Sequence, residues 1–196
     1  MAAIVPRWEW RTFDSEDRVA VGRFAALTAE RVQESDEVYL LSPLTDANVK
    51  VRDDLMDIKT LEAVGPTGLE QWRPIMKASF PLTADAVQAV CSALGVTPPA
   101  ALREATTLEE LVESLEGQGV RAVPVHKLRL RYVIDGAMAE MTEVITGGKR
   151  VRSVAIESED TEQVNQALEE MDLLGITNTS YPRGLKALVG MAAVRA

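Results

Sequence analysis

The stretch that decides the fold runs from His126 to Ser158 and reads HKLRLRYVIDGAMAEMTEVITGGKRVRSVAIES. Polar and apolar residues alternate along most of it, which is the pattern of β-strands with two different faces. The pattern predicts three strands, at Arg121 to Ile134, Ala137 to Ile145 and Arg150 to Ser158. Strong hairpin-turn signals separate them, at Asp135-Gly136 and Gly147-Gly148. Three consecutive antiparallel strands are therefore expected here.

The rest of the chain supplies further strands and the helices between them. Alternation and short apolar runs predict five more strands, at Pro6 to Phe13, Glu37 to Leu41, Asn48 to Arg52, Leu55 to Leu61 and Gln71 to Phe80. Pro74 lies inside the last of these and indicates an edge or a bulge. Cap and stop residues predict helices from Ser15 or Asp17 to about Val32, Thr83 to Leu94, Thr107 to near Gly117, Asp160 or Thr161 to Leu174, and Tyr181 to Val189. The result is an α+β chain with about eight mostly antiparallel strands, enough to close a barrel around a lumen.

Length and composition set the class of protein. The chain has 196 residues, 46% apolar and 26% charged, so it can hold a core and is not disordered. No apolar run reaches the roughly 20 residues of a membrane span, and the start lacks the apolar core of a signal peptide. The single cysteine, Cys91, excludes an internal disulfide and a cysteine zinc site. A net charge of −9 argues against general binding to nucleic acids or anionic membranes. We expect a single cytoplasmic domain spanning residues 1–196.

Several predicted strands carry charged side chains on one face. Lys127, Arg129 and Arg131 face away from two leucines, and Lys50 and Arg52 share a face in the same way. A sheet with one solvated face would explain the pattern. Yet most of these charges are positive in a negative chain, and like charges on one face repel unless an anion lies between them. If the sheet closes with this face inward, a ligand with several phosphates would offset the cost of burying the cations.

The order of the motifs along the chain is more informative than any motif alone. In order they are RWEWR at 7–11, VKVR at 49–52, MDIKTL at 56–61, KLRLRYVID at 127–135, a pair of acidic strands, a helix, and TSYPRGLKAL at 179–188. In this order the chain resembles the CYTH superfamily, the triphosphate tunnel metalloenzymes that include class IV adenylate cyclases, thiamine triphosphatases and inorganic triphosphatases. The resemblance spans almost the whole chain. It implies an eight-stranded antiparallel β-barrel, or tunnel, flanked by helices.

The resemblance also implies roles for individual residues. Those that bind the triphosphate would be Arg11, Lys50, Arg52, Lys59, Lys127, Arg129 and Arg131. Those that bind magnesium or manganese, and so serve catalysis, would be Glu9, Glu140 and Glu157. These residue types suit the chemistry, because guanidinium groups make paired hydrogen bonds to phosphate and Mg²⁺ prefers carboxylate, phosphate and water oxygens.

Several acidic positions of the family pattern hold other residues here. The first-strand motif of the family is E-x-E-x-K, and Arg7 stands in place of its first carboxylate. Ala155 precedes Glu157 where the family has a second carboxylate, and Thr142 follows Glu140 where the family has an aspartate. Three glutamates are enough to hold one metal ion beside a triphosphate, but they are less suited to two.

Three hypotheses about function follow. The resemblance implies a domain that binds a triphosphate-bearing ligand and hydrolyses a phosphoanhydride bond with the help of a metal. The missing carboxylates favour a catalytically degenerate module that binds a nucleotide or polyphosphate without metal. A third alternative is a protein-interaction module, in which an acidic segment of a partner protein occupies the basic tunnel.

Three other features have simpler interpretations. Trp8 and Trp10 could stack on bases, but packing of the outer face of the first strand is the favoured interpretation. His126, the only histidine, is expected outside the lumen because it shares the face of Leu128. Cys91 lies among apolar residues of a predicted helix and is expected in the core.

Overall fold

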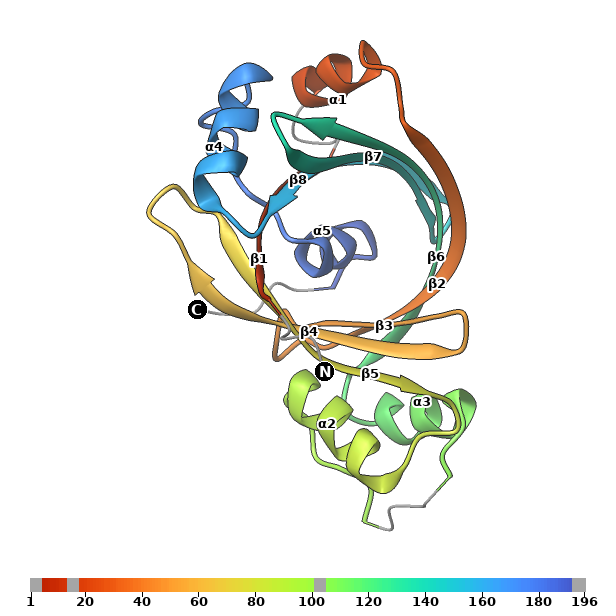
Figure 1. Cartoon of the computed structure of the whole chain (residues 1–196). Helices are drawn as coiled ribbons and strands as arrows, with labels where there is room; N and C mark the ends of the chain where they lie inside the picture. Colours follow the sequence, from red (N-terminus) through yellow and green to blue (C-terminus); the bar gives the residue numbers. More distant parts are fainter. Residues whose placement is uncertain (1–4, 14–17, 101–104, 192–196) are drawn as a thin grey trace.

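Eight strands close into a barrel, with the order β1-β5-β4-β3-β2-β6-β7-β8 around the ring (Figure 1). This computed structural model describes residues 5–13, 18–100 and 105–191. The strands are β1 (Arg7–Phe13), β2 (Arg31–Leu41), β3 (Asn48–Arg52), β4 (Leu55–Val64), β5 (Glu70–Ser79), β6 (Arg121–Ile134), β7 (Ala137–Thr146) and β8 (Lys149–Ser158). Every neighbouring pair is antiparallel, from β1 with β5 around to β1 with β8. The predicted α+β class and eight-stranded antiparallel barrel are confirmed.

Helices cover the barrel from outside and fill part of its inside. They are α1 (Arg18–Ala25), α2 (Ala84–Leu94), α3 (Leu108–Glu116), α4 (Thr161–Glu170) and α5 (Tyr181–Leu188). Within the described residues, none of them is long and apolar enough to span a membrane. In Figure 1, α1 and α4 lie at one side of the ring, α2 and α3 at the opposite side, and α5 within it.

Tight turns fix the register of strands that follow one another in the chain. Asp135 and Gly136 have φ angles of 47° and 81°, in the left-handed region that such hairpin turns require. They join β6 to β7 in a ladder that runs without a register shift. Asp53 and Asp54 join β3 to β4 in the same way, with φ angles of 51° and 55°. The turn predicted at Asp135-Gly136 is confirmed.

Pro74 coincides with a bulge in β5, as its place in the sequence predicts. Ile58 pairs with Met76 and the next residue, Lys59, pairs with Pro74, so Ile75 has no partner across the ladder. The bulge lets the strand continue past a residue that cannot donate a backbone hydrogen bond.

The prediction of a helix reaching Val32 is wrong in its second half. Helix α1 ends at Ala25, and β2 begins at Arg31 rather than at Glu37. The reason is tertiary, because β2 pairs with β6 along its whole length and this ladder satisfies its backbone hydrogen-bonding groups. Outside the described residues lie the two candidate caps of that helix, Ser15 and Asp17.

Helices α2 and α3 pack on the outer face of the wall that contains β3 and β4. Their ends agree with the sequence prediction. The Thr83 hydroxyl accepts a hydrogen bond from the first turn of α2, and Gly95 ends that helix with a φ angle of 70°. Thr107 and Glu110 form a capping box at the start of α3. Cys91 is buried in this core, as expected.

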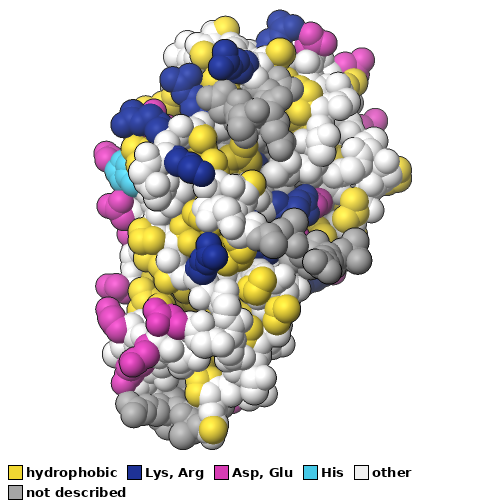
Figure 2. Space-filling view, turned by 180° about the vertical axis from the view of Figure 1, so that it is seen from behind, with side chains coloured by type: hydrophobic (Ala, Val, Ile, Leu, Met, Phe, Trp, Pro, Cys, Tyr) yellow, Lys and Arg dark blue, Asp and Glu magenta, His cyan; other side chains and the backbone are white. Residues whose placement is uncertain are grey.

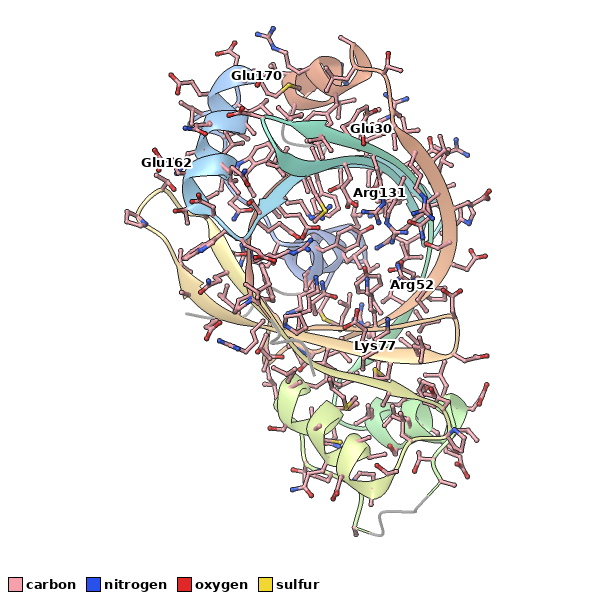
Figure 3. All side chains as sticks on the ribbon, viewed as in Figure 1. Glu30, Arg52, Lys77, Arg131, Glu162 and Glu170 are labelled. Carbon is pink, nitrogen blue, oxygen red and sulfur yellow. The ribbon has the colours of Figure 1, made fainter. Side chains whose placement is uncertain are left out.

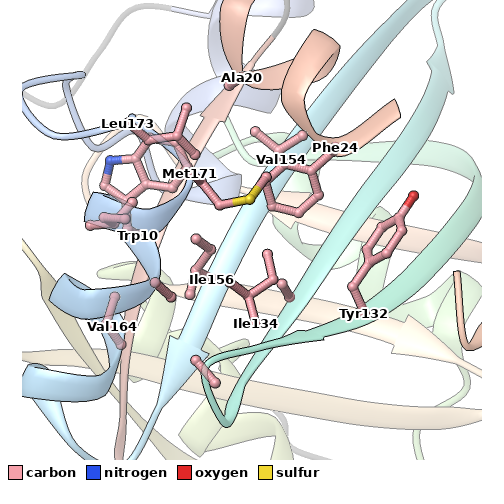
Figure 4. Close-up of a cluster of buried hydrophobic side chains, with 14 of the residues drawn as sticks. Trp10, Ala20, Phe24, Tyr132, Ile134, Val154, Ile156, Val164, Met171 and Leu173 are labelled. Carbon is pink, nitrogen blue, oxygen red and sulfur yellow. The ribbon is translucent and has the colours of Figure 1, made fainter. Parts of the chain in front are cut away.

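A second core lies outside the barrel, between its wall and helices α1 and α4 (Figure 4). Trp10 of β1 is buried in it, and its indole nitrogen donates to the carbonyl oxygen of Ile176 at 3.1 Å. Trp8 is partly buried against the same cluster. The two tryptophans therefore pack the outer face of β1, as favoured from the sequence, and the opposite face of β1 points into the barrel.

Helix α5 fills one end of the barrel from within (Figure 1). Gly184 lies against the ring of Phe13, and a Cβ at this glycine would come within 2.1 Å of a ring carbon. We call the buried hydrophobic cluster of this end the apolar plug, which comprises Phe13, Tyr39, Leu41, Val123, Val125, Val144, Tyr181, Leu185 and Met191. Mainly polar side chains line the rest of the interior.

Candidate functional site

The inner faces of six strands carry the charged residues that the sequence places in one site. All ten line a single cavity, here called the tunnel cavity: Glu9, Arg11, Lys50, Arg52, Lys59, Lys127, Arg129, Arg131, Glu140 and Glu157. It holds about 840 Å³, including the space at its mouth. Arg52 on β3 and Arg131 on β6 lie on the inner side of the ring, whereas Glu162 and Glu170 on α4 lie outside it (Figure 3). Strand alternation and closure of the sheet together produce this gathering.

A buried carboxylate on β2, Glu37, holds four of these cations. Its oxygens lie 2.9 Å from Lys127 Nζ and 3.5 Å from Lys50 Nζ. Glu37 also accepts a hydrogen bond from Arg129 and lies 3.7 Å from Arg52. Burial opposes ionisation of Glu37, but the neighbouring cations, Lys127 first, outweigh burial and hold the pKa of Glu37 well below its usual range. Glu37 is thus the internal counterion of the basic wall.

Lys127 is enclosed between Glu37 and two tyrosine rings. Its Nζ donates to the Tyr39 hydroxyl at 2.5 Å and lies 3.7 Å from the centroid of the Tyr181 ring. The two rings stack with centroids 5.2 Å apart. Burial lowers the pKa of Lys127 well below its usual value, and the nearby charge of Lys50 lowers it further, against the attraction of Glu37.

Arg11 is buried where β1, β8 and β7 run side by side. Its Nε donates to Glu9 at 3.0 Å, one terminal nitrogen to Glu140 at 3.1 Å and the other to the Ser153 hydroxyl at 3.0 Å. Ala155 on β8 stands between Arg11 and Glu140, and its small side chain leaves room for the guanidinium to reach across. Burial acts to lower the pKa of Arg11, but Glu9 and Glu140 outweigh burial and raise it above its usual value. Arg11 therefore remains charged.

Two of the predicted carboxylates, Glu140 and Glu157, have pKa values shifted in opposite directions. Burial opposes ionisation of Glu140, but the Arg11 guanidinium outweighs it and lowers the pKa of Glu140 to about 2. Burial raises the pKa of Glu157, and the charges of Glu9 and Glu140 raise it further. Glu157 stands opposite Glu9 on the adjacent strand, with Arg7 at 3.5 Å.

Comparison with solved structures places this arrangement among known folds. A protein from Hippeastrum, described as an adenylyl cyclase candidate with a dominant triphosphatase activity, aligns with 95% of this chain and 97% of its own, at 12% identity and a TM-score of 0.53. The chain has the same fold as this protein. Two other solved structures align over most of the chain. One is a conserved hypothetical protein from Pyrococcus furiosus, at 16% identity, 90% and 98% coverage of the two chains and a TM-score of 0.49. The other is an adenylate cyclase candidate from Bacillus halodurans, at 10% identity, 88% and 93% coverage and a TM-score of 0.48. Neither a family model nor a curated protein matches the sequence.

The CYTH resemblance implies a divalent metal, but the carboxylates of this chain do not fit one as they are arranged. Among the described residues, no three acidic, histidine or cysteine side chains converge closely enough to hold a metal ion. Arg11 bridges Glu9 and Glu140, and Arg7 faces Glu157. Guanidinium groups thus lie beside the carboxylates, where a divalent ion would need to bind.

Two buried polar atoms in the wall of the tunnel cavity have no hydrogen-bond partner in the described part of the chain. They are the Tyr181 hydroxyl and Asn48 Oδ1. Burial raises the pKa of Tyr181 well above its usual value, so its hydroxyl keeps its proton and can donate. Because buried polar groups normally have partners, both atoms are candidates for ligand contacts.

Positive charge near the mouth is left without an acidic partner. Among the described residues, neither Lys59 nor Arg131 has a carboxylate within ion-pair distance, and Arg131 donates only to Gln33 at 3.3 Å. Outside the tunnel cavity, Arg73 pairs with Glu62 at 2.6 Å. Lys59 and Arg131 therefore offer the tunnel cavity positive charge that no carboxylate of the described residues neutralises.

His126 lies outside the barrel, as expected. Its ring nitrogens are 2.9 Å from Asp36 and 3.2 Å from Glu34. The histidine is visible at the edge of the surface with acidic side chains beside it in Figure 2. His126 therefore has no part in the tunnel cavity.

Sequence reasoning missed four residues of the site, Glu37, Tyr39, Asn48 and Tyr181. Glu37 and Tyr39 share the inward face of β2 with Ser35, a period-two pattern that becomes visible once the strand is extended towards Arg31. Tyr181 lies in the TSYPRGLKAL motif, but nothing in that motif places its helix inside the barrel.

Proposed function

We propose that this chain binds a triphosphate-bearing ligand in the tunnel cavity. The observation that carries the proposal is the gathering of seven lysine and arginine side chains around one cavity, in a chain of net charge −9. Four acidic side chains share the wall, which leaves an excess of three positive charges, or two when the buried Glu37 behind the wall is included. An anion with several phosphate groups would complement this excess, because arginine supplies paired donors and lysine supplies point charge.

The direction of the basic groups supports the same proposal. Lys50 and Arg52 come from β3, Arg129 and Arg131 from β6, and Arg11 from β1. An anion in the tunnel cavity would therefore be surrounded by cations rather than held against one face. The unpartnered Tyr181 hydroxyl adds a neutral donor on the side of the apolar plug.

Calorimetric titration of the full chain with inorganic triphosphate and with ATP tests the proposal. We expect at least one of them to bind, and sulfate at the same ionic strength not to bind. A ligand at a hundred times its Kd should also raise the free energy of unfolding by about 2.7 kcal/mol. Failure of both ligands to bind would overturn the proposal and favour the alternative in which an acidic protein segment fills the tunnel.

Hydrolysis of the bound phosphoanhydride is a second candidate function, favoured by Glu157. Its raised pKa makes it a better proton acceptor than an ordinary carboxylate. In the proposed reaction, water attacks the terminal phosphorus while Glu157 accepts a proton from that water. The bond to the bridging oxygen breaks, and the diphosphate group leaves with its electron pair. Lys127 and Arg129 would neutralise the charge that develops on the phosphate oxygens. The triphosphatase activity named for the Hippeastrum protein supports this reaction class.

Phosphate release from inorganic triphosphate tests this second function. We expect release by the wild type and loss of release in Glu157→Gln, with triphosphate binding retained. Because Glu157→Gln keeps the shape of the side chain, loss of both binding and release would point to a binding role instead. If the wild type releases no phosphate, hydrolysis is overturned and ligand binding remains as the proposed function.

A further inference from the structure

Arg11 is built into the tunnel wall as a fixed cation. Only 5% of the residue is exposed, and all three guanidinium nitrogens donate hydrogen bonds. Two of their acceptors are the carboxylates Glu9 and Glu140, on strands separated by β8. One positive group therefore joins the two acidic residues that would otherwise repel each other in a buried place.

Two residues of β8 add to this pairing of carboxylates with guanidinium groups. Ala155 brings no further carboxylate to the site, and its small side chain leaves the path from Arg11 to Glu140 open. At the next inward position of β8, Glu157 faces Arg7 at 3.5 Å. Each of the three carboxylates that the CYTH resemblance assigns to metal binding thus has a guanidinium neighbour.

A divalent ion would have to compete with these guanidinium groups. At Glu9 and Glu140 it would need to displace a buried arginine that makes three hydrogen bonds, or to lie a few ångströms from its charge. Both alternatives are unfavourable, because a displaced guanidinium loses its partners in a buried place and two cations in close contact repel.

We propose that Arg11 takes the place of a divalent metal in this tunnel, neutralising Glu9 and Glu140 so that triphosphate binds without Mg²⁺ or Mn²⁺. The proposal rests on the function proposed above and specifies its metal requirement. In this proposal, Arg11 contacts the phosphates of the ligand and the carboxylates of the protein at the same time.

Titration of the wild-type chain with inorganic triphosphate, once in EDTA and once in saturating Mg²⁺, is the first test. Binding in EDTA that Mg²⁺ does not tighten is the expected result. Binding only with Mg²⁺ would overturn the role of Arg11 and leave the proposed function standing. No binding in either condition would overturn the proposed function itself.

The second test replaces Arg11 by methionine, which has similar length and no charge. Arg11→Met should weaken triphosphate binding in EDTA at least tenfold, and Mg²⁺ should restore at least fivefold, because Glu9 and Glu140 are then free to hold it. The matched control is Arg131→Met, which removes a cavity cation that touches no carboxylate. It should weaken binding without rescue by Mg²⁺. Wild-type affinity in Arg11→Met, or rescue no greater than in the control, would overturn the assignment.

A measurement on the wild type covers the case in which Arg11→Met does not fold. Manganese is titrated into the protein alone, and free Mn²⁺ is followed by its electron paramagnetic resonance signal. The free signal should match that of buffer without protein. Loss of one equivalent of signal would show that the carboxylates bind metal despite Arg11, and would overturn the proposal.

Discussion

The guanidinium of Arg11 and the carboxylate of Glu140 meet 3.1 Å apart across Ala155, which lies between them on β8. Ala155→Leu should fill that path, separate the pair and lower the free energy of unfolding by roughly 1–3 kcal/mol. Urea denaturation measures the change. The same substitution at the exposed Ala122 of β6 is the control, expected within about 0.5 kcal/mol of the wild type. Equal effects at the two positions would show that the space over Ala155 is not needed.

The affinity of the double variant Lys50→Ala/Arg52→Ala for triphosphate should be about 100-fold lower than that of the wild type, or lower still. Each substitution removes a charged hydrogen-bond donor. A hydrogen bond from such a donor contributes roughly 1.5–3 kcal/mol. Calorimetry measures the loss, and the wild-type affinity should also fall as salt is raised. Arg73→Ala is the control, because Arg73 pairs with Glu62 outside the tunnel cavity. Undiminished binding in the double variant would remove β3 from the site.

The stacked tyrosines should respond in opposite ways to loss of their hydroxyl groups. Tyr39→Phe removes hydrogen bonds to Glu37 and Lys127, so it should lower the free energy of unfolding by about 1–3 kcal/mol. Tyr181→Phe removes a hydroxyl without a partner in the described part of the chain, so it should leave stability unchanged or raise it. Triphosphate binding should weaken about tenfold in Tyr181→Phe, since a ligand contact is lost. Thermal unfolding and calorimetry together check the pair. Unchanged binding in Tyr181→Phe would exclude its hydroxyl from the site.

Glu37 should make the stability of the fold depend on pH in the acid range. Its folded pKa lies below the value of about 4.3 in an unfolded chain, so the ionised carboxylate stabilises the fold above that value. This stabilisation is lost progressively as the pH falls below about 4.3 towards the lowered pKa. Glu37→Gln should be less stable at pH 7 by roughly 3–5 kcal/mol, because four cations lose their counterion.

The measurement is a series of urea midpoints from pH 7 to the acid limit of folding. The stability difference between wild type and Glu37→Gln should shrink steadily below about pH 4.3. Glu62→Gln, which changes a carboxylate at the surface, is the control and should follow the wild-type curve. A constant difference between wild type and Glu37→Gln at all pH values would contradict the assignment of the acid transition to this residue.

Two glycines should give opposite results when changed to alanine. Gly184 on α5 has no room for a methyl group beside Phe13, so Gly184→Ala should destabilise the fold by roughly 1–3 kcal/mol. Gly22 on α1 has open space where a methyl group would lie, with no atom within 4 Å, so Gly22→Ala should stabilise by about 0.5–1 kcal/mol. Thermal unfolding compares the two. A tolerated Gly184→Ala would show that α5 does not sit tightly inside the barrel.

Local patterns predict the strands of this fold well, because turn-forming residues and the alternation of polar and apolar residues are properties of short stretches of sequence. Asp135-Gly136 fixes the β6–β7 hairpin, and the phase of that strand places Lys127 and Arg129 on the inner face. Glu37 escapes such reasoning because the start of β2 is set by its pairing with β6, far along the chain.

The interior of the barrel is harder to predict than its wall. The position of α5 depends on the fit of Gly184 against Phe13, which no local pattern describes. The bridge from Arg11 to Glu140 likewise exists only once β1, β8 and β7 are neighbours. The sequence predicts which residues face inward. Closure of the sheet decides which of these residues pair with one another.

The apolar plug also governs how a long polymer could approach the cations. Because α5 and the ring of Tyr181 fill one end of the barrel, a linear polyphosphate cannot be threaded through it. We expect such a chain to reach Lys127 with a terminus rather than with its internal units. The amount of polyphosphate bound should therefore follow the number of chain ends in a sample rather than the number of phosphate units, and cyclic phosphates, which have no ends, should be poor ligands.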